Sequence, residues 1–389
     1  MKRNKTKEYY YKLCRICYAL GAPNYWYGDL GIPDYVATIH NVLVWIIDLA
    51  IYGFLISAIG SNFTQHNLSA KQRSDRQLLT CIPLWYSYML VFSYYRKDIR
   101  VLGYELAVKL KKEYNDPQVE EEMVWHVKFY FGMFAFFVYA AVAMYGLQSL
   151  MDVIFKGEYF IVVIPVWPDI HDPSTIGRVI RVVLYVLWFV YCTRLIFSSY
   201  IGAIVLTSAL SHQYKNLCSY FRSLNTIFED TDTTQEEKEK AYEKAFILGV
   251  ELHNSTLWCK ERADKICNIV FGFQIFINLS TVTILLMQML TSERTPANLL
   301  TYALAIMCNL VGTGCCWCSA GDITVEASQL STAMYESGWQ HCRGRAALRA
   351  RTLLVVAMWH SQVMMKTIFL NELLVLVSVY IWRSPITLK

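Results

Sequence analysis

Apolar residues are gathered into long blocks along this chain, and shorter polar segments carrying most of the charge separate them. A helix of about 20 apolar residues is long enough to cross a lipid bilayer. The blocks fall at about residues 35–60, 77–95, 127–151, 176–210, 266–291, 298–320 and 363–382. The pattern predicts an all-α integral membrane protein with seven transmembrane helices.

The composition supports this prediction. The 389 residues are 55% hydrophobic and 17% charged, with 15% aromatic residues. A soluble domain carries about a quarter charged residues. The net charge of +5 is modest and lies in the loops, so it reports orientation in a membrane and gives no reason to expect nucleic-acid binding.

Lysine and arginine predict the topology, because loops on the cytoplasmic side of a membrane are rich in both. They are abundant in the N-terminal arm and in residues 96–128, 211–265 and 321–351, and scarcer in the alternate loops. We therefore expect a cytoplasmic N-terminus and an extracellular C-terminus. The resulting segments are 1–34 (cytoplasmic arm), 35–210 (helices one to four), 211–265 (cytoplasmic helical extension), 266–320 (helices five and six), 321–362 (cytoplasmic polar segment) and 363–389 (last helix and tail).

The extension at 211–265 has closely spaced Glu and Lys residues and apolar residues at helical spacing, which predicts a solvated helix. Asp230 or Thr231 is the expected N-terminal cap. The block at 176–210 is too long for one span, and we expect it to continue as a helix into the cytoplasm.

Two polar features lie in or beside the first block. Asp48 stands in its middle, where a carboxylate is costly unless it faces protein or water, so we expect it to form a hydrogen bond between helices. Asn62 and Asn67 begin glycosylation sequons in the following loop, which the topology places outside the cell.

No known catalytic motif is present, and the histidines are scattered. Cys14 and Cys17 form a CxxC pair, but no second pair follows at the spacing of a zinc site. We therefore expect no enzyme activity, no cofactor and no metal site.

The segment TAMYESGW at 332–339, followed by an Arg-rich helix and Ser361-Gln362, resembles the insect odorant receptors, which share the inverted seven-helix plan. The longer run GDITVEASQLSTAMYESGW, at 321–339, looks like that of a moth or butterfly member. This resemblance implies a subunit of a ligand-gated, non-selective cation channel in the plasma membrane of olfactory sensory neurons. The implied partners are membrane lipid, a volatile odorant or pheromone, and the odorant receptor co-receptor in a heteromer expected to be a tetramer.

The resemblance also implies residue roles. Segment 321–362 becomes a cytoplasmic anchor with subunit contacts at Tyr335, Trp339, Arg343, Arg345 and Arg349, beside which ordinary packing of Tyr335 and Trp339 within the chain stays an equal alternative. The last helix becomes the pore, with Leu374, Val377 and Ser378. The odorant site falls in the outer half of the bundle, at Trp85, Tyr86, Met144, Tyr145, Gln148, Tyr185, Trp188, Phe189, Tyr302 and Ile306.

Two other functions stay open at this stage. A gustatory-type receptor channel has the same topology, although its TYhhhhhQF-type closing motif is missing. A transporter would show internal repeats or broken helices, and the sequence shows neither. After Glu372 the chain departs from the resemblance, since LLVLVSVYIWRSPITLK is almost purely apolar before Arg383, which suggests an alternative or mis-joined end.

Overall fold

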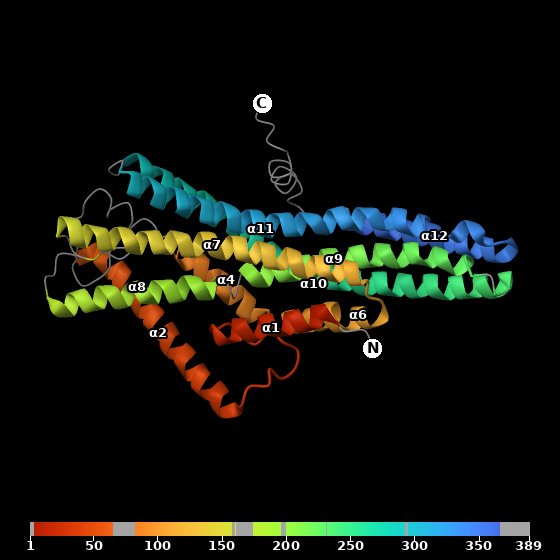
Figure 1. The fold of residues 1–389 in the computed structure, drawn as a ribbon, viewed down its shortest axis with the longest axis horizontal. Coiled ribbons are helices and arrows are strands. Elements are labelled where there is room, and N and C mark those ends of the chain that lie inside the picture. Colours follow the sequence, from red (N-terminus) through yellow and green to blue (C-terminus); the bar gives the residue numbers. More distant parts are fainter. Residues whose placement is uncertain are drawn as a thin grey trace.

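The apolar blocks form helices that run together along the long axis of the molecule (Figure 1). The computed structural model describes residues 4–64, 82–157, 160, 174–195, 200–230, 232–291 and 295–365. Within these ranges the regular secondary structure is helical, and no strand is present. The all-α prediction is therefore confirmed for the described part of the chain.

The helices have these bounds in chain order: α1 Lys5–Ala19, α2 Asp34–Thr64, α4 Ile82–Tyr94, α5 Arg96–Tyr104, the π-helical stretch Glu105–Lys109, α6 Leu110–Glu113, α7 Pro117–Lys156, α8 Thr175–Leu195, α9 Ile201–Ser223, the 3-10 turn Leu224–Phe228, α10 Gln235–Thr291, α11 Pro296–Tyr335, the 3-10 turn Trp339–His341, and α12 Gly344–Met365.

Five helices in the described residues are long and apolar enough to cross a membrane: α2, α7, α8, α10 and α11. They correspond to five of the seven expected spans. The second span is described only as α4, and the seventh lies almost entirely outside the described residues. The count of seven and the orientation in the membrane stay predictions.

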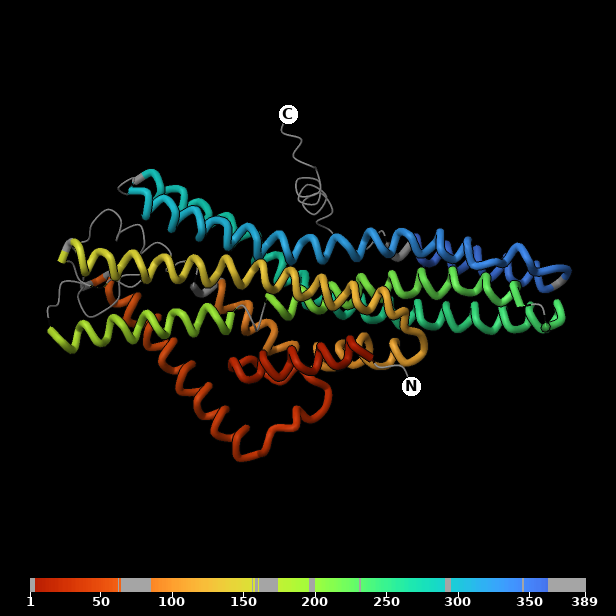
Figure 2. The backbone as a smooth tube through the Cα atoms, in the orientation of Figure 1, coloured from red at the N-terminus to blue at the C-terminus, as the bar shows by residue number. Residues whose placement is uncertain are grey.

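Helices α10 and α11 are both far longer than a bilayer is thick, as is α7, which also has 40 residues. α10 has 57 residues and α11 has 40, which correspond to about 85 Å and about 60 Å at 1.5 Å per residue. The hydrocarbon core of a bilayer is about 30 Å thick, so each helix must continue well beyond it. The tube in Figure 2 follows α10 and α11 to the end of the molecule where α12 also lies. Residues 211–223 and 235–265 of the polar stretch are α-helical, with the 3-10 turn Leu224–Phe228 between them, and α11 continues without a break past residue 320.

The start of α10 differs from the expected cap. Thr234 and Glu237 form reciprocal contacts, with the Thr234 amide 3.0 Å from Glu237 Oε2 and the Glu237 amide 3.4 Å from Thr234 Oγ1. This arrangement is a capping box. Asp230 instead accepts hydrogen bonds from the Asp232 amide and the Thr233 hydroxyl in the preceding turn. The prediction of Asp230 was therefore wrong, and Thr231 lies outside the described residues.

The core is built around α9 and α11, which pack more extensively on each other than any other two helices. α11 also packs against α7, α10 and α12. Gly312 lets α11 approach α7 closely, because a Cβ at this position would lie 2.5 Å from Phe134 Cε2. By contrast, α2 is inclined to the other helices (Figure 1), and its side chains at Trp45, Leu49 and Ile56 are exposed, as lipid-facing residues would be.

Asp48 pairs with Arg194, which joins α2 to α8. Arg194 also donates a hydrogen bond of 3.1 Å to the backbone oxygen of Gly21, just after α1 in the N-terminal arm. Gly21 has a φ of 90°, and a Cβ there would lie 2.9 Å from Arg194 Nε, so the position favours glycine twice over. The expected interhelical hydrogen bond of Asp48 is confirmed, and its partner is a charged group.

The Asp48–Arg194 ion pair predicts a measurable coupling between α2 and α8. Removing one partner leaves the other charge unpaired in a poorly solvated site, which is more costly than removing both. In a double-mutant cycle with Asp48→Asn and Arg194→Gln, we expect a coupling free energy of about 1–3 kcal/mol in thermal or denaturant unfolding. Asp34→Asn, at the exposed start of the same helix, is the control. Additive effects of the two changes would contradict the ion-pair account.

Candidate functional site

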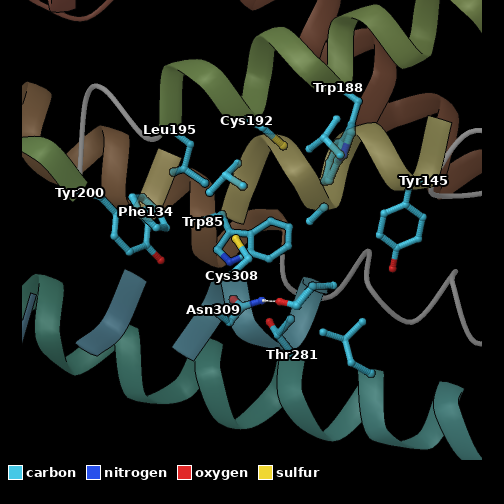
Figure 3. Close-up of a pocket in the computed structure, with 15 residues that line it drawn as sticks. Trp85, Phe134, Tyr145, Trp188, Cys192, Leu195, Tyr200, Thr281, Cys308 and Asn309 are labelled. Carbon is cyan, nitrogen blue, oxygen red and sulfur yellow. Dashed lines mark hydrogen bonds between the residues drawn. The ribbon is translucent and has the colours of Figure 1, made fainter. Parts of the chain in front are cut away.

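A cavity of about 120 Å³ lies among α4, α7, α8, α10 and α11, beside Tyr200 at the start of α9 (Figure 3). Its walls are mostly aliphatic and aromatic, with two thiols and a few hydroxyl and amide groups. The lining residues are Trp85, Phe134, Val138, Ala141, Val142, Tyr145, Trp188, Cys192, Leu195, Tyr200, Thr281, Leu285, Ala305, Cys308 and Asn309.

Helical periodicity explains this set. Residues three or four apart on a helix lie on the same face, so each helix contributes one stripe of side chains to the wall. On α7 this stripe runs inward from Tyr145 to Phe134, and on α8 it runs from Trp188 to Leu195. α10 contributes Thr281 and Leu285, which are one turn apart. The cavity is thus the space between stripes from several helices.

Aromatic rings form the firm part of the wall. The rings of Trp85 and Trp188 have centroids 6.1 Å apart and are tilted by 51°. Phe134 and Tyr200 lie closer, at 4.5 Å and 40°. Such tilted pairs contribute stabilisation beyond the area that they bury, and each ring has few rotatable bonds. The wall should therefore keep its shape when the cavity is empty.

A buried hydrogen-bond network adjoins the inner end of the cavity, at Tyr200. Gln274 of α10 is 1% exposed and lies at its centre. Its Nε2 donates to the hydroxyl groups of Tyr200 at 3.1 Å and Thr313 at 2.7 Å, and its Oε1 accepts from Tyr88. Asn278 donates to Thr313 at 2.6 Å. We call these residues the Gln274 network, and they link α4, α9, α10 and α11.

The outer end of the cavity has a second polar contact. Gln148 of α7 donates a hydrogen bond to Asn298 Oδ1, near the start of α11, and both side chains are buried. Between this contact and the cavity lies a small apolar cluster of Leu285, Tyr302 and Ala305. Two of its members, Leu285 and Ala305, also line the cavity.

Three of the ten expected ligand-binding residues line the cavity: Trp85, Tyr145 and Trp188. Two more, Tyr302 and Ile306, belong to or pack against the small outer cluster. The structure therefore brings half of the expected set to the cavity or its immediate neighbourhood.

The other five lie elsewhere. Tyr86 shares a hydrogen bond with Tyr52, and Tyr185 donates one of 2.9 Å to the backbone oxygen of Val142. Phe189 is 42% exposed on α8, beside Trp188 in sequence but turned away from the cavity. Met144 is partly buried, and Gln148 forms the outer contact described above. No ligand is present, so the residues that touch one stay a prediction.

The sequence reasoning missed the deeper positions and the contribution of α10. The prediction placed its α7 residues in the outer half of the bundle, so it stopped at Tyr145 and did not follow the same stripe down to Phe134. It also left out the fifth block. Thr281 and Asn309 are polar residues inside apolar blocks, and that signal could have identified both.

The expected interface residues lie where α11 turns into α12. Tyr335, at the end of α11, is 56% exposed. The indole N–H of Trp339 donates a hydrogen bond of 3.0 Å to the backbone oxygen of Tyr335. Arg351, which was not predicted, lies over the Trp339 ring at 5.5 Å. Trp339 therefore makes contacts within the chain, and the ring of Tyr335 stays largely open.

The remaining predicted residues give less information. The backbone amide of Arg343 donates a hydrogen bond of 2.7 Å to the carboxylate of Glu239 on α10. Arg349 is exposed. The side chains of Arg345 and Asn62 are not described. Asn67 and the expected pore residues lie outside the described residues, the latter being Leu374, Val377 and Ser378.

Comparison with known proteins adds a family and a fold. The family model described as 7tm Odorant receptor matches residues 77–376. The fold is similar to that of the insect olfactory receptor OR5 from Machilis hrabei, with a TM-score of 0.67 and 13% identity over 90% of this chain and 87% of that chain. The structure of the same receptor in complex with eugenol gives a TM-score of 0.66 and 14% identity, over 90% of this chain and 88% of that chain. No curated protein matches the chain in sequence.

The Gln274 network predicts a contrast between two tyrosines on α4. Tyr88→Phe removes the donor to Gln274 Oε1 and leaves that buried oxygen unsatisfied, which should cost about 1–3 kcal/mol of stability. Tyr94→Phe, on the same helix but 80% exposed, should change stability by less than about 0.5 kcal/mol. Thermal unfolding of the purified chain measures both. Equal effects of the two substitutions would show that the network does not stabilise the fold.

Proposed function

The chain belongs to the 7tm odorant receptor family, and we propose that it is the odorant-binding subunit of a non-selective cation channel formed with the odorant receptor co-receptor. The ligand would be a small volatile odorant or pheromone, held in the cavity among α4, α7, α8, α10 and α11.

The observation that supports this proposal most directly is the cavity itself. It is lined mainly by aromatic and aliphatic side chains and has a volume of about 120 Å³. An apolar cavity of about 150 Å³ in another protein holds benzene. A molecule with one ring or a short alkyl chain therefore matches the size and chemistry of this cavity. Larger odorants would require the walls to move apart.

A few polar groups in the wall suit a ligand with one heteroatom. Tyr145, Tyr200, Thr281 and Asn309 carry hydroxyl or amide groups among the apolar residues. An alcohol, aldehyde or ester could form one or two hydrogen bonds there. Small-molecule sites commonly combine an apolar wall with a few polar groups that fix the orientation of the ligand.

Opening would follow from differential affinity, since a ligand shifts a channel towards the open state only if it binds that state more tightly. The Gln274 network adjoins the cavity at Tyr200 and belongs partly to α10 and α11. Near the start of α10, Tyr242 shares a hydrogen bond of 2.6 Å with Ser337, which follows the end of α11. A change in cavity shape would thus act on helices that reach the expected cytoplasmic anchor.

Assembly with the co-receptor would use that anchor. The exposed ring of Tyr335, with Trp339 and the arginines at 343, 345 and 349, has the composition of an interface, since aromatic residues and Arg are enriched where proteins meet. The last helix, including Leu374, Val377 and Ser378, would line the pore of a tetramer in the plasma membrane of olfactory sensory neurons. Asn62 and Asn67 would carry glycans on the outer side.

The direct test is an odorant-evoked current. Cells that express this chain with the co-receptor should respond to at least one volatile in a broad panel, and cells that express the co-receptor alone should not respond to the same volatile. No response to any ligand, with the chain present at the cell surface, would contradict the channel. Uptake of a substrate without current would favour a transporter.

Two alanines on α11 test the location of the ligand. Ala305 lines the cavity, whereas Ala303 is exposed on the same helix. Ala305→Leu fills part of the cavity and should cost about 1–3 kcal/mol of binding for the larger agonists, which is about 5-fold to 150-fold in half-maximal concentration. Ala303→Leu should leave the dose–response curve unchanged. If the two variants behave alike, the ligand binds elsewhere.

A further inference from the structure

Three side chains that can bind a metal converge near the start of α7. Glu122 and His126 are four residues apart on this helix and therefore lie on one face. His212 extends from α9, which packs against α7. The ligand atoms of these three residues all lie within 4.8 Å of one another. The two imidazole rings meet edge to face, with centroids 5.2 Å apart.

The geometry of His212 suits a metal ligand. Its Nδ1 lies 2.8 Å from the backbone oxygen of Ser208, and because a carbonyl can only accept, the proton must be on Nδ1. That tautomer leaves the Nε2 lone pair available. Metal-binding histidines are commonly oriented by a hydrogen bond of this kind.

The ammonium group of Lys215 would compete with a metal ion for the carboxylate of Glu122. Its Nζ lies 2.6 Å from both carboxylate oxygens of Glu122. The two side chains are 35% and 38% exposed, so water and ions reach them. Glu326 of α11 interacts electrostatically with both Lys215 and Glu122.

We propose that Glu122, His126 and His212 form a Zn²⁺ site that joins α7 to α9, separate from the odorant cavity. Two imidazoles and one carboxylate are a common set of protein ligands for zinc, and an open fourth position holds water. Zinc bonds of about 2.0–2.2 Å require ligand atoms to lie about 3.3 Å apart, so small rotations of the partly exposed Glu122 and His126 side chains close the site. The set favours Zn²⁺ over Mg²⁺ or Ca²⁺, which prefer oxygen ligands.

The test uses the full-length chain purified in detergent, with free Zn²⁺ set by a chelator buffer. Thermal unfolding gives the zinc affinity, and elemental analysis gives the zinc content. We expect Zn²⁺ to raise the unfolding midpoint of the unaltered chain. His126→Asn and Glu122→Gln should each weaken zinc binding by about tenfold or more. His126 is chosen because it is less buried than His212, so its replacement disturbs packing less.

Two further variants separate a metal site from an ordinary ion pair. Lys215→Met removes the competing ammonium and should tighten zinc binding, although it also removes the ion pair with Glu122. His126→Cys supplies another zinc ligand and should retain binding that His126→Asn loses. His40→Asn, on α2, is the matched control and should bind zinc as the unaltered chain does.

A midpoint that does not respond to Zn²⁺ would overturn the proposal. Equal zinc affinity in the unaltered chain and in His126→Asn would do the same, since zinc would then act at the cysteines or elsewhere. A loss of zinc affinity in Lys215→Met would also count against the site.

Discussion

Buried polar groups between membrane helices must find partners within the protein, and the Gln274 network is where this constraint acts most strongly. Gln274 sits on α10 in a bundle where water and lipid offer nothing to its amide. Its partners come from α4, from the residue that precedes α9, and from α11. Satisfying one amide therefore fixes the relative positions of several helices, and the apolar cavity lies directly beside them at Tyr200.

The same constraint explains the ends of the structure. Asp48 and Arg194 satisfy each other between α2 and α8, and Arg194 reaches further to the Gly21 backbone oxygen. This contact joins the N-terminal arm to α2 and α8. On the opposite side of the bundle, α10 and α11 extend as continuous helices to a region joined by Tyr242 and Ser337. Helices of this length reach over a distance greater than the bilayer thickness.

The helical class and the position of most spans were predictable because long apolar blocks have few other solutions in a membrane. The interhelical role of Asp48 followed from the same reasoning. The residue that caps the start of α10 could not be predicted in this way. Asp230 and Thr234 are both good N-caps, and only the path of the backbone decides between them. The cavity was predicted in part. Trp85, Tyr145 and Trp188 followed from the resemblance to the odorant receptors, but rotation about a helix axis decides whether Trp188 or its neighbour Phe189 faces inward. The Glu122–His126–His212 cluster could not be predicted from the sequence, because His212 is far from the other two residues along the chain and only the packing of α9 on α7 brings it close.

The central claim is that a volatile ligand occupies the cavity among α4, α7, α8, α10 and α11 and thereby opens the channel. The most direct measurement is an experimental structure of this chain assembled with the co-receptor, determined with and without an activating odorant. The account predicts ligand density enclosed by Phe134, Trp188 and Ala305, above an intact Gln274 network. Density at another place in the bundle, with this cavity empty, would contradict it.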